Sequence, residues 1–273
     1  MTNMIKADLY RIFRGFNIYL AIGIVILLSS ISVGLREVGH IGNPTVEHQD
    51  DRIVEVDEGN LMPHTIRTDE QKKEFVIDVL SANVNLYYPI IVIVFVVLMA
   101  DFSNRTIKNT LSTAISKNKY YASKLTLVLL LSAALIFFNS IFLYLLNFIV
   151  NGKSYTGAIS PVLATTFKQL PMLLGAASLM TMLGFFTRRA AAFNAIVIPF
   201  QILFQTFINA LCVITKSEPL ANFFSNYELQ AALSKLAFSK DRNYILSCTC
   251  IGVAEIAIST VIGSQIFKKS EIK

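Results

Sequence analysis

The stretch DFSNRTIKNTLSTAISKNKYYASK, residues 101–124, separates two strongly apolar runs and carries five basic residues against one acid, Asp101. The flanking runs have the composition of membrane-spanning helices. A short basic loop between two spans stays on the cytoplasmic side, because translocation of Lys and Arg is disfavoured. Within the loop, Ile107, Leu111 and Ile115 recur every four residues, and the opposite side is polar. This spacing predicts a short amphipathic helix at the cytoplasmic surface of a membrane.

The composition of the whole chain is that of a membrane protein. Of its 273 residues, 54% are hydrophobic and only 15% are charged, whereas soluble domains carry about 25% charged residues. The net charge of +6 is not accompanied by basic patches with interleaved aromatic residues, the pattern that binds single strands. We therefore expect membrane lipid, and no nucleic acid, as a partner.

Six segments approach the length of about 20 apolar residues that a span requires. They are 17–35, 84–100, 125–149, 169–187, 191–214 and 244–267. Met4 to Phe16 has apolar residues on one side and basic residues on the other, which predicts an interfacial helix before the first span. Arg36-Glu37 follows the first span where a signal peptide would have a small-residue cleavage site, so we expect that span to be uncleaved.

The charges of the loops predict the orientation. The segments assigned to the cytoplasm carry 13 basic and three acidic residues, and the segments assigned outside carry 11 basic and 14 acidic residues. Both termini are therefore expected in the cytoplasm. The largest outer segment, 36–83, is acidic. The last, 216–242, mixes apolar and polar residues and predicts a re-entrant hairpin. Abundant Ile, Asn and Lys indicate an AT-rich bacterium and hence a bacterial cytoplasmic membrane.

Motifs for catalysis or metal binding are missing from the sequence. The acidic residues around His48 have no metal-ligand spacing and are interpreted as a solvated loop. Residues 152–154, Gly-Lys-Ser, look like the end of a phosphate-binding loop, but Asn147 stands where that loop needs its first glycine. We expect a single membrane domain over 1–273 that is not an enzyme and binds no metal, nucleotide or other cofactor itself.

Glu255 is the one acid within a predicted span. A charge at the bilayer centre costs about 2.5–3.5 kcal/mol on insertion scales. Gly252, Ser259 and Gly263 share its helical face, and small residues allow neighbouring helices to approach closely. Two interpretations stay open: Glu255 and Ser259 contact a translocation path or subunit interface, or Glu255 is protonated and hydrogen-bonded to a neighbouring helix.

The fifth span carries a polar stripe. Its members are Asn194, Gln201, Gln205 and Asn209, at helical spacing, and Pro199 is expected to bend the helix. The stripe either lines a route for an amphipathic cargo or joins helices through amide hydrogen bonds, and we favour the second interpretation.

The three cysteines are Cys212, Cys248 and Cys250. They are too few for a disulfide framework, and we expect them to be small packing residues. A pair between Cys212 and either of the others stays open, because both helix ends are assigned outside.

Residues 101–124 resemble the cytoplasmic segment of ABC type-2 permeases, the membrane subunits of many ABC exporters. The matching residues are Asp101, Thr106, Ile107, Lys108, Asn109, Leu111, Ser116, Lys117, Tyr120 and Lys124. Family members often have Glu at position 101 and Gly at position 105, where this chain has Arg105. The resemblance extends to the layout of an all-α membrane protein: an N-terminal interfacial helix, six spans, a cytoplasmic helix after span two, and a re-entrant hairpin before span six.

The resemblance implies that residues 101–119 form a coupling helix that binds a separate ATP-binding subunit. The expected coupling residues are Asp101, Arg105, Thr106, Ile107, Lys108, Leu111, Ile115, Ser116 and Lys117. It also implies an exporter of two permeases, identical or homologous, and two ATP-binding subunits, with ATP and Mg on the latter.

The cargo is expected to be amphipathic: an antimicrobial peptide, bacteriocin or toxin, or a lipophilic drug. The acidic outer segment would attract cationic peptides, and a sugar polymer is a rival cargo. The alternative functions are a proton-coupled secondary transporter that uses Glu255, which needs no partner subunit, and a membrane-embedded enzyme or scaffold, which needs clustered catalytic groups.

Overall fold

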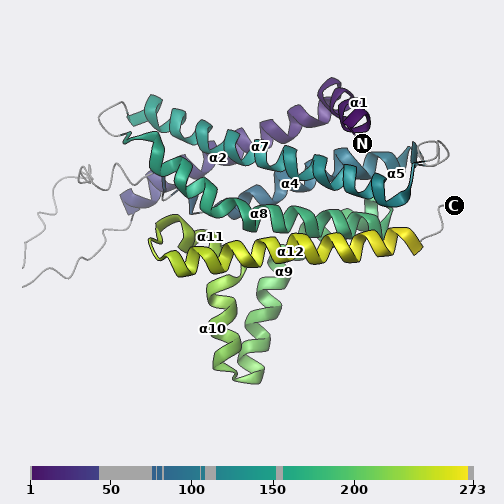
Figure 1. Cartoon of the computed structure of the whole chain (residues 1–273). Helices are drawn as coiled ribbons and strands as arrows, with labels where there is room; N and C mark the ends of the chain where they lie inside the picture. The colour runs from purple at the N-terminus through teal and green to yellow at the C-terminus, as the bar shows by residue number, and fades with distance from the viewer. Residues whose placement is uncertain are drawn as a thin grey trace, which may run out of the picture.

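The computed structural model describes residues 2–42, 76–77, 79–81, 83–104, 106–107, 115–151 and 156–269. Every regular element within these ranges is a helix (Figure 1). The helices are α1 (Thr2–Arg14), α2 (Phe16–Gly42), η1 (Asn83–Leu86), α4 (Tyr87–Val94), η2 (Phe95–Met99), α5 (Ala100–Ser103), α7 (Lys117–Asn151), α8 (Ile159–Thr187), α9 (Ala190–Thr215), α10 (Glu218–Tyr227), α11 (Leu229–Phe238) and α12 (Arg242–Lys269).

Four of these segments are long and apolar enough to cross a membrane: Asn83–Ser103, Lys117–Val150, Ile159–Thr187 and Arg242–Lys269. Two bent pairs of helices raise the number to six if each pair is one span. They are Met4–Arg14 with Ile18–Val33, bent by 63°, and Ala190–Gln201 with Thr206–Thr215, bent by 53°. The chain therefore has the make-up of a multi-pass membrane protein, as its composition predicts.

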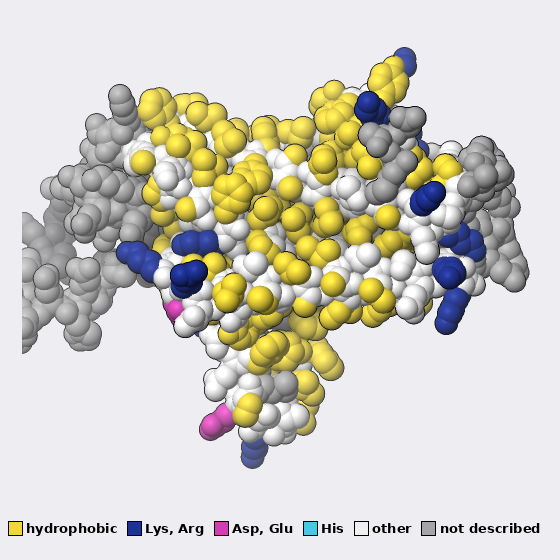
Figure 2. Space-filling view, viewed as in Figure 1, with side chains coloured by type: hydrophobic (Ala, Val, Ile, Leu, Met, Phe, Trp, Pro, Cys, Tyr) yellow, Lys and Arg dark blue, Asp and Glu magenta, His cyan; other side chains and the backbone are white. Residues whose placement is uncertain are grey.

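The long helices α7, α8 and α12 lie side by side, and α8 packs against both of the others (Figure 1). Helices α2 and α4 complete the bundle on the far side of α7 and α8. The outer half of α9 and the whole of α10 leave the bundle as a projecting hairpin, and α11 returns to it. On the face shown in Figure 2, apolar side chains cover the middle of the bundle, while Lys and Arg gather towards its two ends.

Four segments that the charge count assigns to the cytoplasm lie at one end of this bundle. Lys117 donates a hydrogen bond to the carbonyl oxygen of Lys268 (3.1 Å), which joins the start of α7 to the end of α12. The rings of Phe185 and Phe267 lie 4.8 Å apart between centroids, which brings the end of α8 to the same place. The N-terminal helix α1 also lies there (Figure 1). Four segments to which the charge count assigns one side of the membrane therefore lie together in the structure.

The helices differ in length from the predicted spans. Helix α8 begins at Ile159, ten residues before the predicted start at 169. Polar residues in its first turns lower the local hydropathy, so the sequence predicts the start of the span too late. Thr165 and Thr166 are nevertheless buried, and Lys168 reaches the carbonyl oxygen of Ser239 at 2.9 Å. Burial against neighbouring helices thus satisfies polar groups that look like loop residues in the sequence.

The boundaries of the predicted coupling helix also differ. Asp101 belongs to α5, which continues the second span as far as Ser103, and Lys117 is already the first residue of α7. The stretch between these helices is the connecting segment, residues 104–116. Only Asn104, 106–107 and 115–116 of it are described.

The predicted hairpin 216–242 forms two helices, α10 and α11, that meet at Glu228. The Glu228 carboxylate accepts hydrogen bonds from the backbone N–H groups of Gln230 and Ala231, which caps the N-terminus of α11. All three cysteines are free, and Cys248 is buried in the main core.

Candidate functional site

Five side chains form an ionic cluster where α1, α5 and α7 meet: Asp8, Arg11, Asp101, Tyr120 and Lys124. The Lys124 ammonium lies 2.6 Å from an Asp101 carboxylate oxygen and 2.8 Å from one of Asp8. Tyr120 donates a hydrogen bond to Asp101 at 2.7 Å. Arg11 pairs with Asp101 and lies 3.3 Å from Asp8. Two carboxylates and two cations thus balance in charge.

Helical spacing places these groups on shared faces. Asp8 and Arg11 are three residues apart on α1, and Tyr120 and Lys124 are four apart on α7, so each pair lies on one side of its helix. Most of the cluster is buried, with Asp101 4% and Lys124 2% exposed, whereas the Arg11 side chain is 44% exposed. A buried charge needs a partner, and removing one partner of a buried pair is strongly destabilising. The ionic cluster therefore holds three helices in a defined arrangement.

The cluster joins both ends of the connecting segment. Asp101 lies three residues before it, and Tyr120 and Lys124 lie in the first two turns after it. Thr106 donates a hydrogen bond to the Asp101 carbonyl oxygen at 3.3 Å. Ile107 is buried in the main core. Displacement of the segment would thus act directly on α1, α5 and α7.

The predicted coupling residues have different environments. Asp101 and Ile107 are buried inside the chain, and Ile115 packs partly buried against the main core. Ser116 is exposed, and its hydroxyl accepts a hydrogen bond from the backbone N–H of Lys119 (3.4 Å) at the start of α7. Lys117 is bonded to α12 as described above. Three further predicted residues, Arg105, Lys108 and Leu111, lie outside the described residues.

Two charged residues of the basic stretch are thus internal. The sequence alone assigns Lys124 to the basic surface of the loop, but the structure buries it between two aspartates. Asp101 lies inside the chain, where it pairs with Arg11 and Lys124. The sequence contains the necessary signal, since Asp101, Asp8 and Lys124 all adjoin apolar helices, but a sequence pattern does not pair residues 116 positions apart.

A second region is the seam between α8 and α12. A Cβ atom on Gly252 would lie 2.5 Å from the backbone of Pro171, and one on Gly175 would lie 2.3 Å from a Glu255 carboxylate oxygen. Ser259 donates a hydrogen bond to Ser178 at 2.7 Å. The face predicted from its small residues is confirmed as a helix-packing face.

A cavity of about 490 Å³ adjoins this seam. Helices α8, α9, α10, α11 and α12 and Tyr87 of α4 line it. Its walls are apolar apart from Gln201, Glu228 and Glu255, and six of the lining residues are aromatic. Gln201 donates a hydrogen bond to Glu228 at 2.9 Å, which links α9 to the start of α11. We call this space the acid-lined cavity.

The residues predicted for a translocation path or interface are only partly brought together. Gln201 and Glu255 both line the acid-lined cavity, whereas Ser259 is buried in the seam. Asn194 is half-buried on α9. Gln205 and Asn209 belong to α9, but their side chains lie outside the described part of the chain.

A set of buried amides at the opposite end of the bundle was missed by the sequence analysis. Asn83 donates to Gln169 (2.7 Å), Asn139 donates to Asn83 (3.1 Å), and Ser29 donates to Asn139 (2.6 Å). Gln169 also donates to the carbonyl oxygens of Leu80 and Leu233. The sequence did contain a signal for this network, namely amide side chains within or beside apolar runs. This amide network joins five elements, α2, η1, α7, α8 and α11, to one another or to their flanking backbone.

No protein-family model matches this chain, and no curated protein matches it in sequence.

Proposed function

We propose that the chain is the membrane-spanning permease subunit of an ATP-driven exporter of the kind that the ABC type-2 permeases represent. A separate ATP-binding subunit, present in two copies with ATP and Mg, would contact the connecting segment. A second permease copy or homologue would complete the exporter. The membrane would be the bacterial cytoplasmic membrane, with both termini on the cytoplasmic side.

The observation that carries this proposal is the ionic cluster at both ends of the connecting segment. A partner that moves this segment needs a stiff attachment to the spans. The buried ion pair between Asp101 and Lys124, together with the hydrogen bond from Tyr120 to Asp101, provides such an attachment between α5 and α7. Asp8 and Arg11 extend the attachment to α1. Energy enters such a system through contacts that differ between two states of the partner.

The location of the basic segments supports the orientation. The N-terminal helix, the connecting segment, the α8–α9 turn with Arg188 and Arg189, and the end of α12 gather at one end of the bundle. Their basic charge favours the cytoplasmic side. This arrangement would present one basic surface to a soluble subunit.

The proposal is tested by capture of an ATP-binding subunit from the same genome on the tagged chain in membranes. Leu111→Asp interrupts the apolar stripe, and Ser112→Asp is the matched control, because it adds the same charge on the polar side. We expect Leu111→Asp to insert in the membrane but to lose the ATP-binding subunit, and Ser112→Asp to retain it. Equal capture by both variants would refute the contact between Leu111 and the ATP-binding subunit.

Glu255 favours a second candidate, a proton-coupled secondary transporter, because its carboxyl group lines a cavity between helices. The two functions differ in their energy source. Proteoliposomes that contain this chain alone, under a pH gradient and without ATP, separate them. Transport that is abolished by Glu255→Gln in this system would establish the second function and overturn the first.

A further inference from the structure

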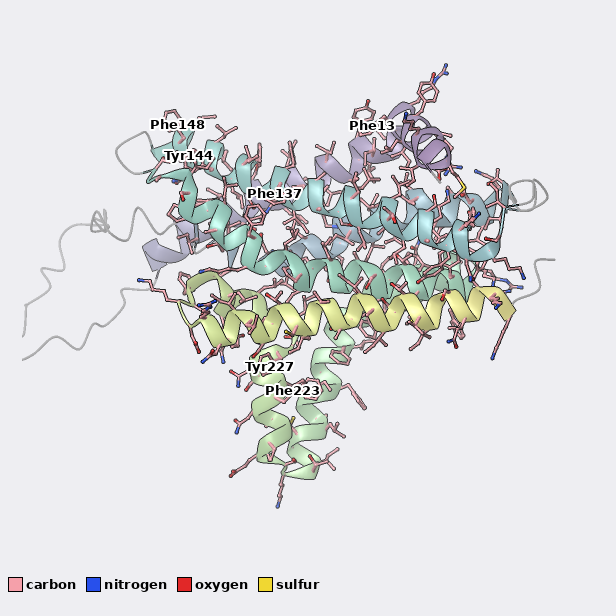
Figure 3. All side chains as sticks on the ribbon, in the orientation of Figure 1. Phe13, Phe137, Tyr144, Phe148, Phe223 and Tyr227 are labelled. Atoms are coloured by element: carbon pink, nitrogen blue, oxygen red, sulfur yellow. The ribbon has the colours of Figure 1, made fainter. Side chains whose placement is uncertain are left out.

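The acid-lined cavity has the size and walls of a small-molecule site. Its volume of about 490 Å³ lies within the range of about 300–1,000 Å³ that ligand pockets occupy. Two of its lining rings are partly exposed, Phe200 of α9 at 40% and Phe223 of α10 at 49%. Phe223 and Tyr227 stand one turn apart on α10, where the projecting hairpin meets the bundle (Figure 3).

The charge of the lining is one-sided. Two of its residues, Glu228 and Glu255, are acids, and none of the residues that line the cavity is Lys or Arg. Glu228 is already engaged, because its oxygens accept hydrogen bonds from Gln201 and from two backbone N–H groups. Glu255 has no hydrogen bond or ion pair within the described part of the chain. It is therefore the acid that is free to meet a ligand.

Gly175 provides the space in which the Glu255 carboxyl group lies, since any side chain at that position would overlap it. The carboxyl group is thus held at the wall formed by α8 and α12.

Aromatic rings make up much of the remaining wall. Six lining residues are aromatic: Tyr87, Phe200, Phe204, Phe223, Phe224 and Tyr227. The rings of Phe200 and Phe204 stack at 5.3 Å between centroids, and Phe204 meets Phe224 edge to face at 6.2 Å. Aromatic faces attract cations, and they also provide large apolar contact areas for a ligand body.

We propose that the acid-lined cavity binds a lipophilic cation: an apolar body with a single positive charge that lies beside the Glu255 carboxylate. The ligand's apolar body fills the aromatic part, and its charge compensates Glu255, the lining acid that has no partner among the described residues. Binding itself is a property of this chain alone. The role of the cavity as the cargo site rests on the proposed export function.

The experiment measures binding of tetraphenylphosphonium to the purified full-length chain in detergent by equilibrium dialysis. The variants are Glu255→Gln and, as a control, Glu218→Gln, which removes an exposed acid from the same hairpin. We expect Glu255→Gln to weaken binding by about tenfold or more, as for the loss of a poorly solvated charge contact, and Glu218→Gln to leave it unchanged. Equal binding by wild type and Glu255→Gln would overturn the proposal.

A second measurement needs no variant and so does not depend on the folding of Glu255→Gln. Triphenylphosphine oxide has a similar apolar body without a net charge. We expect it to bind wild type about tenfold more weakly than the cation. Equal affinity would show an apolar pocket only and would overturn the proposal. Because both measurements omit the ATP-binding subunit, their failure leaves the proposed export function standing, and loss of that subunit leaves this binding intact.

Discussion

Replacing Lys124 by methionine removes the buried cation of the ionic cluster while keeping a side chain of similar length. Asp8 and Asp101 then face each other with only Arg11 to compensate them. Arg11 is 44% exposed, whereas Lys124 is 2% exposed, so the remaining cation is the better solvated of the two. The variant therefore leaves buried negative charge that is only partly matched.

The expected loss follows from the burial of the pair. Removing one partner of a buried ion pair destabilises by about 3–5 kcal/mol. Because Arg11 remains near both aspartates, we expect a value near the lower limit, about 3 kcal/mol. At about 2–4 °C per kcal/mol for chains of 150–250 residues, this corresponds to a fall in Tm of about 6–12 °C.

The assay is thermal unfolding of the purified chain in detergent, followed by the loss of helical circular dichroism. Lys119→Met is the matched control, because Lys119 is exposed on the same first turns of α7. We expect that control to stay within about 0.5 kcal/mol of wild type. The double variant Asp101→Asn with Lys124→Met removes one charge of each sign, and its loss should be smaller than the sum of the single losses. Additive losses, or equal behaviour of Lys119→Met and Lys124→Met, would refute the reasoning.

Three further outcomes are expected. Gly252→Ala should lower stability in the same assay by about 1–3 kcal/mol, because its Cβ would meet the backbone of α8. The control Gly23→Ala, whose Cβ meets nothing within 4 Å, should be neutral or stabilising. Equal losses would contradict close packing at the seam. Gln169→Leu should lower stability by about 1–3 kcal/mol, since it leaves two carbonyl oxygens and an amide without a donor or acceptor; an unchanged Tm would show that the amide network is dispensable. In a cysteine-free chain, single cysteines at Asn118 and Asn243 should be labelled by impermeant maleimide from opposite sides of the membrane, the first only from the cytoplasm; labelling of both from one side would refute the orientation.

The sequence determined the class of protein, an all-helical chain with several segments apolar enough to cross a membrane. Long apolar runs have few stable forms in lipid, because every backbone polar group must be satisfied within a helix. Loop charge was enough to sort the segments into two groups, and the structure brings one group, the segments assigned to the cytoplasm, together at one end of the bundle. The small-residue face around Gly252 was also predictable, because the helical spacing of its residues is visible within one short stretch of sequence.

The pairing of polar residues needed the tertiary structure. Lys124 and Thr165 have the sequence context of loop residues, although neighbouring helices bury them. Gln169 is recognisable as an amide at the edge of an apolar run, but the sequence does not identify its partners. Glu255 is visible in the sequence as an isolated acid, but the cavity beside it forms from helices distant in the chain. Periodicity and charge are properties of neighbours along the chain and so can be read from it. Which cation meets which carboxylate depends on the packing of whole helices, and that was decided only in three dimensions.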